Sequence, residues 1–234
     1  MAGARRSEGS RRGHDRRRHG DRRRPGSGKD FSLGGALDEF EDAVAGSEHE
    51  ARAYCAERTG TLASVILSLR ALPIPVIAAV NGQAAGAGFS LVLACDLRVV
   101  SERTRLHFAY GSLPASTDGG MSWLLPRTVG PSKALSLLLE QPIIRGQRAL
   151  VEGLATELVP AADLQESALR LAKDLSHGPR HSVAAATRLV RTAWSNDLAD
   201  HMREEHRIFA EGLLTDDMAA ALVARRSGDV PAFR

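Results

Sequence analysis

Apolar residues recur at helical spacing in the segment between residues 36 and 70. The first stripe comprises Leu37, Phe40 and Val44, and the second comprises Leu62, Val65, Ile66 and Leu69. Intervals of three and four residues place the members of each stripe on one face of a helix. We therefore predict helices across this segment, with Gly46 and Gly60 as the breaks between them.

An apolar run leads into a glycine-rich turn near the middle of the chain. The run extends from residue 74 to residue 80 and is interrupted only by Pro75. The turn covers 81–88, and a second apolar run, 89–95, follows it. This order predicts a buried strand, a turn and a helix whose first N–H groups point into the turn.

Shorter elements follow towards the C-terminus. Strands are expected at 96–100 and 106–109, and helices at 133–139 and 146–153. The stretch from there to residue 226 is helix-like almost throughout. Strands followed by crossover helices and then by a helical tail fit an α/β spiral with a C-terminal helical subdomain.

Two glycine-rich turns, 31–35 and 81–88, carry the clearest chemical signal. Glycine leaves the backbone N–H groups of a turn unshielded. Two such donors that converge on one point bind the oxygen of a thioester carbonyl as it becomes negative. The partial positive charge at the start of the helix after the second turn suits the same oxyanion. Either turn alone is weak evidence, because glycine also marks ordinary tight turns.

Four sequence blocks follow one another in an order and spacing typical of one enzyme family. They are Phe31-Ser32-Leu33-Gly34-Gly35, 73–82, 84–88 with Ala94-Cys95-Asp96-Leu97, and 118–127 with Val129-Gly130. In these blocks the chain from Lys29 to its end resembles the crotonase (enoyl-CoA hydratase/isomerase) superfamily. The resemblance implies a ββα spiral core over residues 29–175, with a short strand at 158–159. It also implies a C-terminal helical oligomerisation subdomain over 176–234.

The resemblance further implies an acyl-CoA thioester as substrate, with its carbonyl oxygen held between two backbone N–H groups. These groups map to Gly35 and Ala87. The family usually has glycine at the second position, and alanine keeps the N–H that the role requires. Leu33, Gly34 and Gly86 are predicted beside them as substrate-binding residues.

The proton-transfer residues of the family's hydratases are altered in this chain. The resemblance places their two glutamates at Ser90 and Tyr110, and neither serine nor tyrosine is a good base at neutral pH. Relatives that shift double bonds often carry an aspartate in the loop where Asp118 stands. One carboxylate suffices for an allylic shift, so isomerisation is favoured over hydration, with Asp118 as the catalytic residue.

Asp118 has a second interpretation, which the sequence leaves open. An aspartate followed by Gly119 and Gly120, just before an apolar helix, also fits an N-cap. One aspartate could serve both purposes. The remaining predicted substrate-binding residues are Ser90, Tyr110, Trp123 and, by resemblance from the C-terminal helix of a neighbouring subunit, Arg225.

Charge is distributed unevenly along the 234 residues. Residues 1–29 carry ten arginines and one lysine against three acidic residues, a net charge of +8, whereas the whole chain carries +3. Such an arm attracts nucleic acid by charge, but it has no aromatic residue to stack on bases, so a nucleic-acid partner is not expected. Residues 1–28 are interpreted as a disordered or aberrant leader, with the N-terminal part of the core missing or replaced.

The sequence contains no zinc, phosphate-loop or dinucleotide motif, so neither a metal nor a cofactor is expected beyond the coenzyme A of the substrate. No apolar run reaches the ~20 residues of a membrane helix, and no signal peptide is expected. With two unpaired cysteines this predicts a cytoplasmic enzyme, and the resemblance implies a homotrimer or homohexamer. Two alternatives remain: a hydratase without the usual glutamates, acting on coenzyme A or carrier-protein thioesters, and a catalytically silent acyl-CoA-binding protein.

Overall fold

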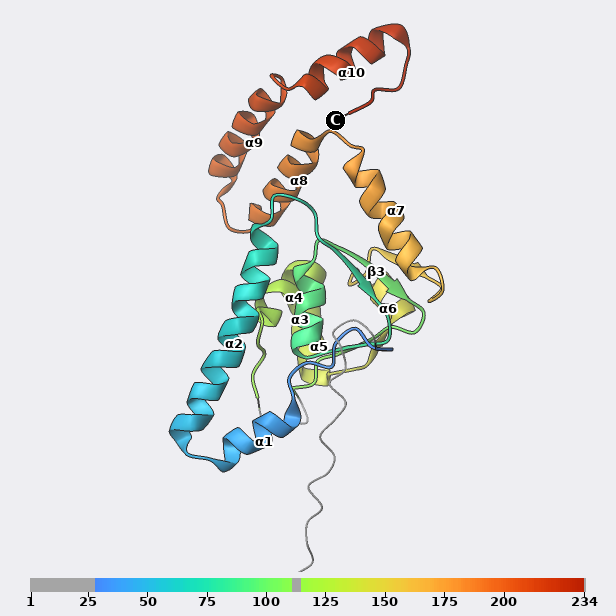
Figure 1. Ribbon diagram of the computed structural model, residues 1–234. Helices are drawn as coiled ribbons and strands as arrows, with labels where there is room; N and C mark the ends of the chain where they lie inside the picture. Colours follow the sequence, from blue (N-terminus) through green and yellow to red (C-terminus); the bar gives the residue numbers. More distant parts are fainter. Residues whose placement is uncertain (1–27, 111–114, 234) are drawn as a thin grey trace, which may run out of the picture.

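The computed structural model describes residues 28–110 and 115–233 (Figure 1). Apart from Gly28, the predicted leader lies outside the described residues. The helices are α1 (Leu37–Ala45), α2 (Glu48–Ala71), α3 (Ala87–Ala94), α4 (Met121–Val129), α5 (Pro131–Glu140), α6 (Gly146–Val151), α7 (Leu164–Ser176), α8 (Arg180–Thr192), α9 (Leu198–Gly212) and α10 (Asp216–Ser227). The strands are β1 (Ile77–Val80), β2 (Gln83–Ala85), β3 (Leu97–Ser101), β4 (Arg105–His107), β5 (Ile144–Arg145) and β6 (Glu157–Val159).

Two small sheets form the α/β core. In the first, the strand order is β1–β3–β6 and all neighbours are parallel, with Val80 of β1 level with Val100 of β3. In the second, the order is β2–β4–β5, where β2 and β4 are parallel and β4 and β5 are antiparallel. Parallel strands covered on both faces need apolar residues at nearly every position, which explains the continuous apolar runs in the sequence.

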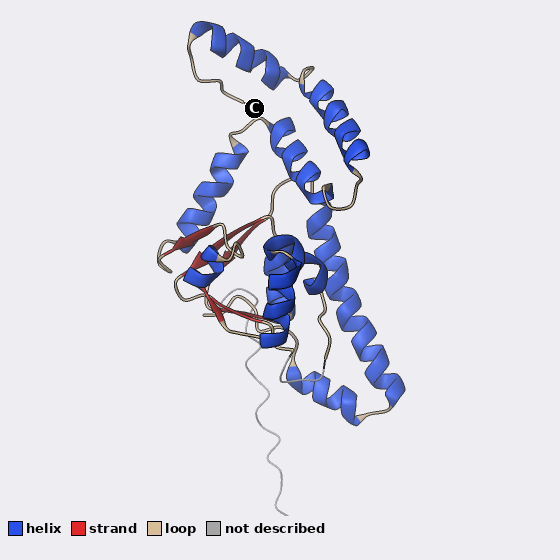
Figure 2. Ribbon diagram, turned by 180° about the vertical axis from the view of Figure 1, so that it is seen from behind, coloured by secondary structure: helices blue, strands red, loops and turns tan. Residues whose placement is uncertain are grey.

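Helix α3 lies at the centre of the core, beside the sheets (Figures 1 and 2), and contacts both α2 and α4. Its Phe89 is fully buried, and the ring centroid of Phe89 lies 5.3 Å from that of Phe108. The first sheet is covered by α7, whose Leu164 and Ala168 pack against Val99 of β3. Apolar side chains therefore surround α3 and hold its first turn in a fixed place.

The predicted α/β class is confirmed, and several predicted elements have different ends. The strand predicted at 96–100 begins one residue later, as β3, because the carboxylate of Asp96 accepts the N–H of Val76 at 2.7 Å. The strand predicted at 106–109 ends at His107, because Ala109 has a φ of +60°. The segment predicted as a single turn, 81–88, contains the short strand β2.

The predicted helix break at Gly60 is wrong, whereas the break at Gly46 is confirmed. Helix α2 begins with a capping box between Ser47 and Glu50 and continues through Gly60 for 24 residues. A glycine inside a helix costs about 1 kcal/mol relative to alanine. The other residues of this long helix, among them the buried Ile66, stabilise it by more than this amount.

Helices α8, α9 and α10 stand at one end of the molecule, on the opposite side of the sheets from α1 (Figure 1). Several large apolar side chains on this part of the chain remain exposed, including Leu198 (74%), Phe209 (70%) and Leu214 (87%). Arg191 of α8 ties the region to the core through an ion pair with Asp96. None of the helices in the described residues is long and apolar enough to cross a membrane.

Candidate active site

The two glycine-rich turns lie directly against each other. Ser32 of the first turn forms a parallel β-bridge with Ala84, and its carbonyl accepts the N–H of Ala85 at 2.8 Å. The carbonyl of Gln83 accepts the N–H groups of Phe31 at 2.9 Å and of Ser32 at 3.1 Å. Two segments that are far apart in the sequence are therefore joined as neighbouring extended strands.

Two glycines permit this close approach. Gly34 has a φ of +84°, and a Cβ atom there would lie 2.8 Å from the carbonyl oxygen of Ala85. Gly88, in the first turn of α3, faces Ser32, whose Cβ and carbonyl oxygen would each lie 2.6 Å from an added Cβ. A side chain at either position would push the turns apart, so glycine is required by contact as well as by conformation.

Gly35 and Ala87 carry the predicted thioester-binding N–H groups, and both lie at this junction. Ala87 is the first residue of α3 and follows the cap residue Gly86, whose N–H donates to the carbonyl of His107 at 3.1 Å. The Ala87 nitrogen would lie 3.6 Å from a Cβ on Gly34. Across residues 28–110 and 115–233, no acceptor takes the N–H of Gly35 or of Ala87. Unbonded donors at a helix N-terminus are suited to an oxyanion.

Asp118 is held by polar groups from two other parts of the chain. The phenol of Tyr110 donates a hydrogen bond to Oδ1 of Asp118 at 2.9 Å, and the N–H of Asp118 lies 3.4 Å from the same phenol oxygen. Ser90, fully buried on α3, donates its hydroxyl to the main-chain carbonyl of Asp118 at 3.0 Å. Burial, together with the charge of Asp118, raises the pKa of Tyr110 to about 12. The phenol is therefore protonated at neutral pH and acts as a donor.

The N-cap interpretation of Asp118 is wrong. The N-cap of α4 is Gly120, which has a φ of +73°, and no side chain caps this helix. Asp118 contributes its main-chain carbonyl, which accepts the N–H of Met121 at 3.0 Å. Its carboxylate is turned to Tyr110 instead, so the helix start does not use it.

The first turn of α3 connects the two halves of the site. Ala87 offers its N–H, and Ser90, three residues later, holds the loop that carries the carboxylate. Residues three apart are neighbours on a helix surface. From α2, methyl groups of Leu62 and Ile66 would lie 2.8 and 3.1 Å from a Cβ on Gly119. Apolar methyl groups of α2 thus lie beside Gly119, the residue that follows Asp118.

The other predicted substrate-binding residues lie in different places. Leu33 is 62% exposed beside the junction, and Gly86 forms part of it. Trp123 lies elsewhere: its ring stacks on Arg127, with the guanidinium carbon 3.7 Å from the ring centroid, and lines a cavity of about 170 Å³ near the C-terminal end of α3. Arg225 is exposed in the last turn of α10. Within one chain, neither Trp123 nor Arg225 is brought to the turns.

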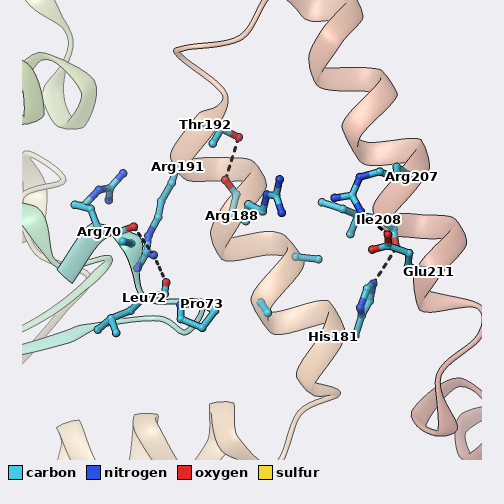
Figure 3. Close-up of a pocket in the computed structure, with 13 residues that line it drawn as sticks. Arg70, Leu72, Pro73, His181, Arg188, Arg191, Thr192, Arg207, Ile208 and Glu211 are labelled. Atoms are coloured by element: carbon cyan, nitrogen blue, oxygen red, sulfur yellow. Dashed lines mark hydrogen bonds and ion pairs between the residues drawn. The ribbon is translucent and has the colours of Figure 1, made fainter. Parts of the chain in front are cut away.

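A larger cavity, of about 510 Å³, opens between the end of α2 and helices α8 and α9 (Figure 3). Its basic side chains already have acidic partners. Arg188 pairs with Glu204 at 2.6 Å, Arg207 pairs with Glu204 and Glu211, and Arg191 is bonded to the core. This cavity therefore lies where helices α2, α8 and α9 meet, and most of its charged side chains are paired with one another or with the core. Among the described residues, no group of three or more acidic, histidine or cysteine side chains is arranged to hold a metal ion.

Residues 25–226 match the family model described as enoyl-CoA hydratase/isomerase. The chain belongs to the enoyl-CoA hydratase/isomerase family. A solved enoyl-CoA hydratase from Polaromonas sp. JS666 is 32% identical to it and superimposes with a TM-score of 0.81, over 89% of this chain and 79% of that one. The predicted crotonase-like fold is therefore confirmed, and a family that acts on acyl-CoA thioesters is established.

Curated relatives agree on the family and carry hydratase names. A "Probable enoyl-CoA hydratase" of Rhodobacter capsulatus is 33% identical over 147 residues, which are 63% of this chain and 57% of that protein. "Probable enoyl-CoA hydratase echA12" of Mycobacterium bovis is 34% identical over 217 residues, which are 89% of this chain and 74% of that protein. The match thus spans little more than half the length of the Rhodobacter protein. Neither name specifies an isomerase.

The sequence did not reveal how Asp118 is held. It predicts Tyr110 and Ser90 as substrate contacts, and the structure shows that both also bond to Asp118. These bonds join residues 8 and 28 positions apart, so no helical or strand periodicity marks them. The available signal was the resemblance itself, because the same two positions carry the glutamates in hydratases.

Proposed function

We propose that this protein binds an enoyl-CoA thioester and moves its carbon–carbon double bond. In this proposal the N–H groups of Gly35 and Ala87 bind the thioester oxygen, and Asp118 transfers the proton. The observation that carries the proposal is the polar cluster around Asp118, to which Ser90 of α3 and Tyr110 contribute. The positions of the two hydratase glutamates hold Ser90 and Tyr110, and both donate hydrogen bonds to Asp118.

The shift needs one base and no added reactant. Starting from a 3-enoyl thioester, the carboxylate of Asp118 removes a proton from C2, and the electron pair of that C–H bond moves towards the carbonyl. The two N–H groups hold the resulting dienolate oxygen, and each such donor is typically worth ~3 kcal/mol of barrier. The protonated Asp118 then gives the proton to C4. The double bond now lies between C2 and C3, and Asp118 is again a carboxylate.

The direct test is the isomerisation of 3-enoyl-CoA, followed by the absorbance of the conjugated product. We expect turnover by the native protein and a loss of at least ~100-fold in kcat for Asp118→Asn, the usual range for a proton-transfer residue. Asp174→Asn, on the exposed face of α7, is the matched control and is expected to retain full activity. Undiminished activity in Asp118→Asn would remove Asp118 from the mechanism.

Hydration is the second candidate, and the names of the relatives favour it. In that reaction water adds to C3 of a 2-enoyl thioester of coenzyme A or of a carrier protein. Incubation in ¹⁸O-labelled water distinguishes the two reactions. Hydration incorporates the label into a 3-hydroxyacyl product, whereas isomerisation incorporates no oxygen from water. Thermal stabilisation by acyl-CoA without either product would identify a silent binding protein.

We further propose a homotrimer or homohexamer in which α10 of one subunit brings Arg225 to the coenzyme A phosphates of another. The exposed apolar side chains of α9 and its surroundings support an assembly through this region. Light scattering on a sizing column measures the subunit number. Arg225→Ala is expected to raise KM for coenzyme A thioesters and not for N-acetylcysteamine thioesters, which lack phosphates. Both cysteines are unpaired, which supports a reducing, cytoplasmic setting.

A further inference from the structure

The chain that leads from β4 to Tyr110 is bent in an unusual way. Ala109 has a φ of +60°, in a region that residues with a side chain rarely occupy and that costs of order 1 kcal/mol or more. The residue before it, Phe108, is 1% exposed and packs against Phe89 in the core. The core therefore anchors one side of the bend, and on its other side the phenol of Tyr110 meets Asp118.

Tyr110 donates to one oxygen of the Asp118 carboxylate and not to the other. Its phenol oxygen lies 2.9 Å from Oδ1 of Asp118, while Ser90 holds the main-chain carbonyl of the same residue. In the described part of the chain, no donor reaches Oδ2 of Asp118. A hydrogen bond to one oxygen favours the carboxylate orientations that keep this oxygen on the phenol, and so it restricts the direction of the second oxygen.

We propose that Tyr110 is a positioning residue for the isomerisation, which holds Oδ1 of Asp118 so that Oδ2 faces the allylic carbons of the substrate. The inference rests on the proposed function of Asp118. The polar partners of the phenol are compatible with a constant donor: Asp118 is its charged neighbour, and Ser90 adds a neutral hydroxyl.

The kinetic experiment compares Tyr110→Phe with Tyr54→Phe, since the chain has two tyrosines. Tyr54 lies on α2 and contacts Phe40 and Arg58 through its ring, which the substitution keeps. We expect Tyr110→Phe to lower kcat about 10- to 100-fold, the size of a hydrogen bond to a charged group, with KM changed less than about twofold. Tyr54→Phe should match the native protein.

A second measurement keeps the native shape of the side chain. In a Tyr54→Phe background, 3-fluorotyrosine labels Tyr110 alone, and its more acidic phenol is a stronger donor. Because the hydrogen bond to Asp118 is kept, kcat should then stay close to that of Tyr54→Phe, in contrast to Tyr110→Phe. The fluorine NMR signal should also shift in Asp118→Asn, because that substitution removes the charged partner of the phenol.

These outcomes separate the two proposals. If Asp118→Asn is inactive while Tyr110→Phe behaves like Tyr54→Phe, the positioning role is overturned and the function of Asp118 stands. An unchanged fluorine signal in Asp118→Asn also overturns the positioning role, because it shows that the two groups are not paired. If Asp118→Asn keeps full isomerase activity, the proposed function fails, and the positioning role fails with it even where the fluorine signal shows the pair.

Discussion

Replacing Arg191 with alanine removes the main polar link between α8 and the core. The side chain is 9% exposed, and its Nε donates to Oδ1 of Asp96 at 2.8 Å. Its terminal nitrogens donate to the carbonyls of Arg70 at 2.9 Å and Leu72 at 2.5 Å (Figure 3). They also donate to the carbonyl of Ile74 at 3.2 Å. The last carbonyls of a helix lack partners within it, so this guanidinium both caps α2 and pairs with a carboxylate from beyond α3.

The size of the effect follows from what Asp96 would retain. Its side chain is 17% exposed, and after the substitution it would keep the N–H of Val76 at 2.7 Å and Arg70 at 3.4 Å. Breaking a buried ion pair from one side costs about 3–5 kcal/mol. Because two partners remain, we expect a loss near the lower end, about 3 kcal/mol in the free energy of unfolding. Arg188→Ala, on the same helix but 61% exposed, should cost about 0.5 kcal/mol.

Urea unfolding measures both variants against the native protein. Fluorescence of Trp123 in α4 and of Trp194 just after α8 reports on the core and on the C-terminal helices, and circular dichroism reports on all helices. We expect a lower midpoint for Arg191→Ala with little change in the dependence on urea. A difference below about 1 kcal/mol between Arg191→Ala and Arg188→Ala would refute the reasoning, because surface substitutions alone produce effects of that size.

Three further outcomes are expected. Burial raises the pKa of Asp96, but the hydrogen bonds from its guanidinium partner and a backbone N–H outweigh it and hold the pKa below 3.8. The stability that this carboxylate adds is therefore complete above pH 3.8 and is lost as the pH falls through the folded pKa, so urea midpoints of native protein and Asp96→Asn should converge in acid. Burial raises the pKa of the Cys95 thiol to about 11, whereas Cys55 is exposed. A thiol reagent at mildly alkaline pH should therefore label only Cys55 in the folded protein and both cysteines in urea. Cys55→Ser should remove the fast reaction. Gly88→Ala should lower kcat/KM at least about tenfold by separating the turns, and native kinetics in this variant would contradict the contact with Ser32. At Gly60 an added Cβ meets no atom within 4 Å, so Gly60→Ala should stabilise α2 by about 0.5–1 kcal/mol.

Strands and close turns could be predicted from the sequence because their causes are local. A strand buried on both faces needs an apolar residue at nearly every position, and 74–80 has that pattern. The turns need glycine where two backbones touch, and Gly34 and Gly88 stand at those contacts. The same local reasoning failed at Gly60, because one glycine costs a long helix less than its packing contributes.

Contacts between distant polar groups could not be predicted. The Asp-Gly-Gly pattern at residue 118 predicts an N-cap, but positive φ at Gly119 and Gly120 moves the helix start beyond the reach of the carboxylate. The ion pair between Asp96 and Arg191 spans 95 positions, and no periodicity connects them. Such contacts depend on the finished fold, which also explains why Trp123 lies by Arg127, far from its predicted place.

The buried first turn of α3 has a consequence for how this protein can diverge. In the proposed mechanism, backbone N–H groups bind the thioester, and no substitution other than proline removes them. The groups around the transferred proton are the side chains of Ser90, Tyr110 and Asp118. Substitutions at these three positions could therefore exchange one reaction for another while the binding of the thioester is retained. A substitution at Gly88 has the opposite character, since it disturbs every reaction that the scaffold could support. Selection on such a chain would conserve the glycines more strictly than the acid.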